Sequence, residues 1–184
     1  MTEKKSRVSK AQWLDMALEV FEKEGINGVK IEQLAKLLGV AKSGFYWHFK
    51  DRRQLLEQML EYWEYEYTIV LKQFIEYKTK LTPEEIIFTI MRLLRENKIV
   101  RYELAIRAWA ETDEIARETA QRAYQIRYNV LKKIFKTLGY KGNKLEARVR
   151  LFVVYGTWNT FMFSGDSEKK SIDLEKELLK LFTS

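Results

Sequence analysis

The chain has 184 residues, a net charge of +7 and no cysteine. Its apolar fraction of 46% is too high for a disordered chain, and the missing cysteines exclude disulfides, thiolate metal sites and cysteine nucleophiles. The positive balance indicates a polyanionic partner, because lysines and arginines that bind nucleic acid release its condensed counterions. Residues 1–56 hold eleven basic and seven acidic side chains, so +4 of the +7 lies in under a third of the chain. The sequence has no apolar run long enough for a membrane span and no recognisable export signal, which favours a cytoplasmic location.

The first half of the chain predicts four helices and no strand, because helical periodicity is dense and turn residues are few. Ser9 is expected to cap a first helix that ends at Gly25, with one apolar stripe made by Trp13, Leu14, Ala17, Leu18 and Phe21. A second short helix carries Ile31, Leu34, Ala35 and Leu38 and stops at Gly39. A third helix over residues 42–49 follows closely, and Asp51 is expected to cap a long fourth helix.

The second half is expected to continue as helices separated by clear capping and turn residues. Thr82-Pro83 begins one helix, Thr112 or Asp113 separates the next two, and Gly139 ends a long one. Gly142 or Asn143 begins another, within which residues 151–163 are apolar nearly all round. Such a helix indicates burial against its own core on one side and against a second subunit on the other. Ser171 is expected to cap a final helix over residues 171–182.

The third helix has two chemically different sides. On a helical wheel of residues 42–50, Phe45 and Phe49 are neighbours and should face the core. The opposite side then holds Ser43, Gly44, Trp47 and Lys50, flanked by Lys42 and Tyr46. Such groups suit a DNA major groove, since Lys and Ser reach base edges while Tyr, Trp and His donate to phosphate oxygens. In a helix-turn-helix the start of the second helix enters the groove, so Lys42 and Ser43 are predicted to read bases.

The segment GVAKSGFYWHFKDRRQLL at 39–56, together with Gly25, Gly28 and the helix over 31–38, resembles the signature of the TetR family of bacterial transcriptional regulators. The resemblance covers roughly residues 9–62 and implies that Tyr46, His48 and Arg52 hold phosphates. Lys30 departs from the usual Ser or Thr cap, and Ala41 and Gly44 stand where relatives often have a hydroxyl or an acid. The predicted DNA-binding residues are Lys30, Lys42, Ser43, Gly44, Tyr46, Trp47, His48, Lys50 and Arg52.

The implied architecture is all-α with about nine helices: a helix-turn-helix domain over residues 1–56 and a ligand-sensing, dimerising domain over 57–184. Five aromatic side chains with polar tips are the predicted lining of a mostly apolar ligand pocket: Trp63, Tyr67, Trp109, Tyr128 and Trp158. The helices over 143–163 and 171–182 are predicted to pair with their copies in a homodimer that binds a palindromic operator. The predicted protein is a repressor released by a small apolar or aromatic ligand.

Several residues have alternative interpretations. Tyr46 and Trp47 could pack at the seam with the fourth helix, and Lys4, Lys5 and Arg7 fit either a solvated tail or an arm on DNA. Glu103 and Arg107 could orient a ligand, although a surface pair is favoured. His48 is the only histidine and lacks a second metal ligand, and no phosphate-binding glycine loop or HExxH motif is present. We therefore expect no metal, no cofactor and no enzyme; the remaining alternative is a ligand-independent helical module that binds DNA or protein.

Overall fold

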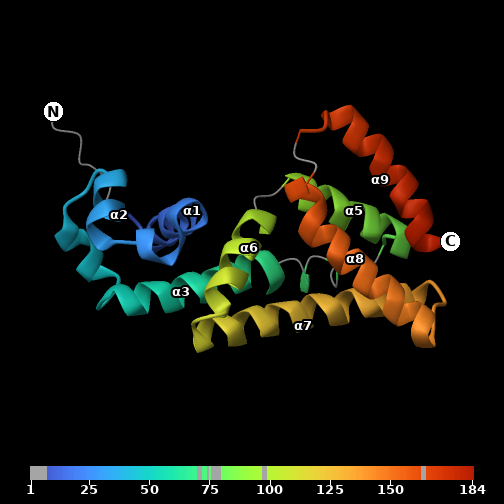
Figure 1. Cartoon of the computed structure of the whole chain (residues 1–184), viewed down its shortest axis with the longest axis horizontal. Coiled ribbons are helices and arrows are strands. Elements are labelled where there is room, and N and C mark those ends of the chain that lie inside the picture. The colour runs from blue at the N-terminus through green and yellow to red at the C-terminus, as the bar shows by residue number, and fades with distance from the viewer. Residues whose placement is uncertain (1–7, 70–71, 74, 76–79, 97–98, 163–164) are drawn as a thin grey trace. The chain divides into compact units, whose positions relative to one another are not determined.

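The computed structural model describes residues 8–69, 72–73, 75, 80–96, 99–162 and 165–184 (Figure 1). Within these ranges all regular structure is helical and no strand occurs, which confirms the predicted all-α class. The chain forms two compact units: unit 1 comprises residues 1–65 and 105–120, and unit 2 comprises residues 66–104 and 121–184. The predicted domain boundary after residue 56 lies inside a helix of unit 1.

Unit 1 begins with α1 (Lys10–Gly28), α2 (Ile31–Leu37), the short helix η1 (Lys42–Trp47) and α3 (Arg52–Glu64). Ser9 caps α1 as predicted, in a reciprocal capping box with Gln12. Gly25 has a φ of 68°, so α1 changes direction there before its last turn. Asp51 caps α3 by accepting a hydrogen bond from the backbone N–H of Gln54 at 2.8 Å. Local sequence signals therefore set the starts of α1 and α3.

The aromatic core of unit 1 holds η1 against α1. The Phe45 and Phe49 rings are buried, as predicted, with their centroids 5.1 Å apart, and Trp13 meets Phe45 edge-on at 5.5 Å. Burying one such ring contributes about 1.5–3 kcal/mol. Trp109 belongs to the same unit, because it packs edge-on against Phe21 at 5.6 Å. The segment Ala105–Ala120 is thus part of the unit that carries η1.

The predicted third helix differs in type from the observed one. Residues Lys42–Trp47 form a 3₁₀-helix rather than an α-helix extending to Phe49. Its tight bonds include Gly44 N–H to the Ala41 carbonyl and His48 N–H to the Phe45 carbonyl, both 2.9 Å. A central glycine and an uncapped start at Ala41 weaken an α-helix of this length, which accounts for the tighter winding.

Unit 2 contains α5 (Pro83–Glu96), α8 (Gly142–Met162), α9 (Glu168–Thr183) and most of α7 (Glu114–Thr137). A π-helical turn, η2 (Tyr65–Ile69), continues from α3 and begins where unit 1 ends. The helices α6 (Ile99–Ala110) and α7 each contribute residues to both units. The core of unit 2 consists of Ile87, Ile90, Met91, Leu131, Ile134, Phe135, Leu145, Val149, Phe152 and Phe182.

Most predicted helix ends in unit 2 are confirmed, and one is wrong. Thr82 forms a capping box with Glu85 at the start of α5, and α8 begins at Gly142. The predicted cap of the last helix at Ser171 is wrong, because α9 begins at Glu168 and Ser167 accepts the backbone N–H of Lys170 at 3.3 Å. Ser167 precedes an acid that favours the helix start, so it takes the cap before Ser171 is reached.

Four predicted positions, Lys4, Lys5, Arg7 and Phe163, lie outside the described residues. Across the residues that the structure does describe, no helix combines the length and the apolar content needed to cross a bilayer.

Candidate nucleic-acid interface

One side of η1 presents polar and aromatic groups to solvent. The Trp47 side chain is 72% exposed and that of Tyr46 is 55% exposed, so the alternative that they pack in the seam with the fourth helix is wrong. Lys42, Ser43 and Lys50 are exposed as well, and Gly44 is partly exposed. We call these six residues, 42–44, 46, 47 and 50, the reading surface. It opposes the buried Phe45 and Phe49, as the helical wheel predicts.

Lys42, the predicted base-reading lysine, forms an ion pair with Glu32 of α2. The hydrogen bond from Lys42 lowers the pKa of Glu32, and the same bond raises the pKa of Lys42. Both side chains are exposed, so an incoming phosphate or base can exchange for the carboxylate. The sequence gives no sign of Glu32 as a partner of Lys42, because the pair joins two helices through a turn whose geometry the spacing does not reveal.

Arg52, a predicted phosphate ligand, faces the turn between α1 and α2. Its Nε donates to the Val29 carbonyl at 2.6 Å, and its Nη2 donates to the Ile26 carbonyl. These carbonyls lie at the end of α1, where backbone acceptors lack helical partners. Arg52 thus stabilises the turn, and a phosphate would use its remaining N–H groups.

His48 and Lys30 occupy the edges of the interface. The His48 Nε2 lies 2.9 Å from the Val8 carbonyl oxygen, so this nitrogen acts as a donor and fixes the chain just before α1. Lys30 is exposed at the start of α2 and makes no side-chain cap, as the sequence indicates. A methyl group built on Gly44 would meet no atom within 4 Å. An alanine therefore fits at Gly44 without displacing the core.

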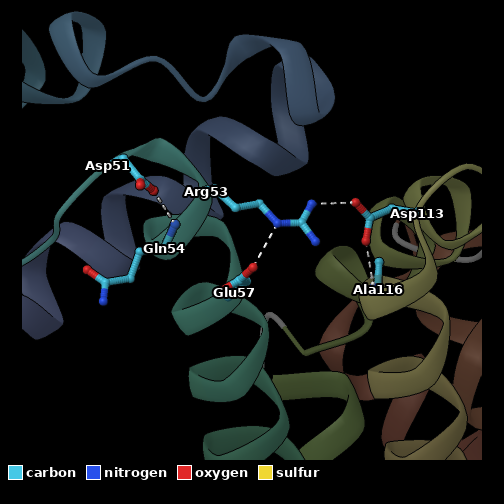
Figure 2. A network of polar contacts seen from close by, with 6 residues as sticks. All are labelled: Asp51, Arg53, Gln54, Glu57, Asp113 and Ala116. Carbon is cyan, nitrogen blue, oxygen red and sulfur yellow. Dashed lines mark hydrogen bonds and ion pairs between the residues drawn. The ribbon is translucent and has the colours of Figure 1, made fainter.

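A polar network ties the start of α3 to the start of α7 (Figure 2). The Arg53 Nε donates to Glu57 at 2.7 Å, and its Nη1 donates to Asp113 Oδ2 at 2.8 Å. The other oxygen of Asp113 caps α7 by accepting the Ala116 N–H at 3.1 Å. Burial alone would raise the pKa of Asp113, but the hydrogen bonds from Ala116 and Arg53 together lower it. Asp113 was predicted only as a helix break, since Arg53 lies sixty residues earlier.

The predicted ligand-binding aromatics are divided between the units. Trp63 and Trp109 are buried in unit 1, whereas Tyr67, Tyr128 and Trp158 belong to unit 2. Tyr67 lies 5.7 Å from the Tyr102 ring, and the Tyr128 hydroxyl donates to Glu146. Trp158 is 46% exposed on α8.

The favoured surface placement of Glu103 is wrong. Its side chain is buried in unit 2, and its carboxylate accepts a hydrogen bond from Arg127 Nη1 at 2.5 Å. Arg127 Nε also donates to Thr68 at 2.9 Å. A buried carboxylate is retained when a guanidinium satisfies it, and the partner here lies twenty-four residues away rather than one turn along the helix.

Comparison with known proteins matches the helix-turn-helix region most clearly. The family model for "Bacterial regulatory proteins, tetR family" matches residues 14–59. The HTH-type transcriptional regulator AcrR of Shigella flexneri is 30% identical over 79 residues, covering 43% of this chain and 35% of that protein. The chain therefore aligns with about a third of that relative's length.

Solved structures resemble the whole fold. A TetR transcriptional regulator from Legionella pneumophila has a TM-score of 0.74 at 14% identity, covering 95% of this chain and 96% of that one. The transcriptional regulator FadR from Bacillus subtilis, in complex with stearoyl-CoA, has a TM-score of 0.70 at 18% identity, covering 96% and 98%. The helix-turn-helix region, residues 14–59, thus matches the TetR family of bacterial regulatory proteins, as the signature indicates, and the whole chain shares its fold with these solved structures.

Proposed function

We propose that this protein is a homodimeric transcriptional repressor that binds a palindromic DNA operator through the reading surface. The observation that carries the proposal is the exposure of Tyr46 and Trp47 beside Lys42, Ser43 and Lys50, on the side of η1 opposite its buried phenylalanines. Exposed large aromatics at a basic surface suit a partner that offers both phosphates and base edges. Because that partner is cellular DNA, we propose that the protein acts in the cytoplasm.

In the proposed complex the residues divide into two roles. Lys42 and Ser43 stand at the start of η1 and donate to base edges in the major groove. Tyr46, Trp47, His48, Lys50 and Lys30 donate to phosphates and set the register. Lys42 must break its ion pair with Glu32 before it can donate to a base, so Glu32 competes with DNA for Lys42.

Dimerisation is supported by an apolar stripe on unit 2. On α8, the exposed residues Leu151, Val154, Trp158 and Met162 recur at helical spacing along one side. On α9, Leu181 is exposed as well. We propose that these helices (orange and red in Figure 1) pair with their copies around a two-fold axis. Such a dimer presents two reading surfaces about 34–36 Å apart, one turn of duplex.

A small apolar or aromatic ligand is proposed to release the operator. The complex of FadR with stearoyl-CoA gives a precedent on the same fold. Within unit 2, the proposed lining comprises Tyr67 and Tyr128, whereas Trp158 is assigned to the dimer stripe. Because α7 contributes residues to both units, we propose that the effect of ligand binding passes along α7 to Asp113 and from there to Arg53 of α3. The ligand can weaken DNA binding only by the difference between its affinities for the DNA-binding state and the released state of the protein.

The test is a selection from random duplexes with the full chain, followed by fluorescence anisotropy on the enriched sequence. We expect a palindrome, and we expect Lys42→Ala to weaken binding about tenfold or more and to relax specificity at one position. Tyr46→Phe should weaken binding to all sequences by removing a phosphate contact. Lys133→Ala, which removes an exposed lysine of α7, is the charge-matched control.

Three results would overturn the proposal in whole or in part. If no palindrome is enriched, or if Lys42→Ala behaves like Lys133→Ala, the reading surface does not select sequence. If a palindrome is enriched but no apolar ligand changes its affinity, the protein is instead a ligand-independent DNA-binding module.

A further inference from the structure

Unit 2 contains an open groove of about 780 Å³ lined by parts of α5, α8 and α9 and by the start of the turn before α9. This volume lies within the range of about 300–1,000 Å³ found for small-molecule sites. The groove is separate from the predicted aromatic lining, because none of those five aromatic residues borders it. Its walls combine apolar side chains, Leu174 and Leu178, with a group of charged ones.

Glu175 is the unusual residue of the groove. The side chain lines the groove although the residue is only 2% exposed. One carboxylate oxygen accepts a hydrogen bond from Arg95 Nε at 2.9 Å. The other oxygen, Oε2, is buried and has no hydrogen-bond partner among the described residues. A buried acceptor without a donor costs about 1–3 kcal/mol, and more when it is charged, so a molecule that brings a donor to this oxygen is favoured.

The charges around Glu175 disfavour an anion and favour a cation. Arg95 is shared among three carboxylates, with Glu96 at 3.5 Å and Glu168 at 3.8 Å in addition to Glu175. Lys170 is paired with Asp166 at 2.6 Å. The groove is thus lined by three acids and two bases, and both bases are already engaged. A carboxylate or phosphate ligand would have to displace one of these pairs.

Tyr155 closes the side of the groove next to Glu175. Its ring packs edge-on against Phe182 at 5.6 Å and lies 5.8 Å from Phe152. Burial, together with the charge of Glu175, raises the pKa of Tyr155 to about 12, so the hydroxyl stays protonated at neutral pH. A neutral phenol beside a carboxylate offers an oxygen acceptor and a ring face, and both suit an ammonium group.

We propose that this groove binds a small organic cation, an alkylamine or a similar amphipathic ammonium. Its N–H groups donate to Glu175 Oε2 and its apolar part lies against Leu174 and Leu178. If the protein is the regulator proposed above, this cation would be its effector, and the apolar part of the cation matches the apolar ligand expected from the sequence. The binding itself requires no DNA.

The experiment is calorimetric titration of the full chain with three probes of one length: n-hexylamine, n-hexanol and hexanoate. We expect n-hexylamine to bind at least about tenfold more tightly than the other two, since a charge-assisted hydrogen bond to a buried carboxylate distinguishes them. Glu175→Gln should reduce n-hexylamine affinity about tenfold or more. Glu84→Gln, the same change at an exposed position of α5 outside the groove, should leave it unchanged.

The proposal is overturned if n-hexylamine binds no better than n-hexanol, or if Glu175→Gln has no effect. A groove filled by a second copy of the chain would give the first of these results. If Glu175→Gln does not fold, Tyr155→Phe and the three-probe comparison on the unaltered chain still decide the matter. Amine binding without operator binding would contradict only the proposed regulatory function. Operator binding without a preference for the amine would contradict only the proposed cation site.

Discussion

Substituting Asp113 separates the two interactions that this residue makes. Its Oδ1 caps α7 through the Ala116 N–H, and its Oδ2 accepts from Arg53 (Figure 2). Asp113→Asn keeps a capping oxygen but removes the charge, whereas Asp113→Ala removes both interactions. The pair of variants therefore measures the cap and the ion pair separately.

The structure gives the expected sizes. Loss of a helix cap costs about 1 kcal/mol. The ion pair contributes less, about 0.5 kcal/mol, because half of the Arg53 side chain is exposed and solvent screens it. We expect Asp113→Asn to lower the free energy of unfolding by about 0.5 kcal/mol and Asp113→Ala by about 1.5 kcal/mol. Once Asp113 is already Asn, Arg53→Ala should add only the cost of its remaining ion pair with Glu57.

Urea unfolding followed by circular dichroism measures these differences. If Asp113→Asn costs as much as Asp113→Ala, the charge dominates rather than the cap, which contradicts the sizes expected above. The pH dependence gives a second check, because the pKa of Asp113 is lowered from 3.8 in the folded chain. A lowered pKa adds stability that is full above 3.8 and is lost as the pH falls through the folded value. The difference between the natural chain and Asp113→Asn should vanish in that acidic window.

Three further perturbations test other parts of the molecule. Glu32→Gln should raise operator affinity roughly fivefold at low salt and less at high salt, because Lys42 loses its competing carboxylate; anisotropy titrations at two ionic strengths check this, and an unchanged affinity contradicts it. Val154→Lys should weaken the dimer by about 3 kcal/mol, because it buries an unpaired charge. Analytical ultracentrifugation measures the change, and the control Lys133→Glu should leave the mass of the dimer in solution unaltered. Phe45→Ala should lower the free energy of unfolding by about 3–5 kcal/mol, measured by thermal melts. A loss under about 1 kcal/mol, the size of a surface change, would mean that this ring does not anchor η1.

The features that the sequence predicted correctly depend on residues close together in the chain. Ser9, Asp51 and the Thr82 capping box act within three residues, so the capping pattern is visible in the sequence itself. The burial of Phe45 and Phe49 follows from their spacing on one side of a helix, and it holds although the helix winds more tightly than expected. Short-range geometry is nearly independent of the rest of the fold.

The missed features join residues that only the folded chain brings together. Arg53 meets Asp113 across sixty positions, and Arg95 meets Glu175 across eighty. Nothing in the pattern around Glu103 indicates Arg127, so a one-turn surface pair was the favoured interpretation. Such pairs are set by how helices pack, which periodicity does not specify. The cavity beside Glu175 was unforeseen for the same reason.

The 3₁₀ turn of η1 places its anchoring side chains and its solvent-facing side chains on opposite sides. Lys42, Ser43 and Gly44 lie outside the core, and the space around Gly44 is open. Mutations at these three positions can therefore accumulate with little loss of folding stability. A library randomised there should stay folded while its members prefer different duplexes. In evolutionary terms, a duplicated copy of this gene could acquire a new target by a few point mutations and keep its scaffold intact.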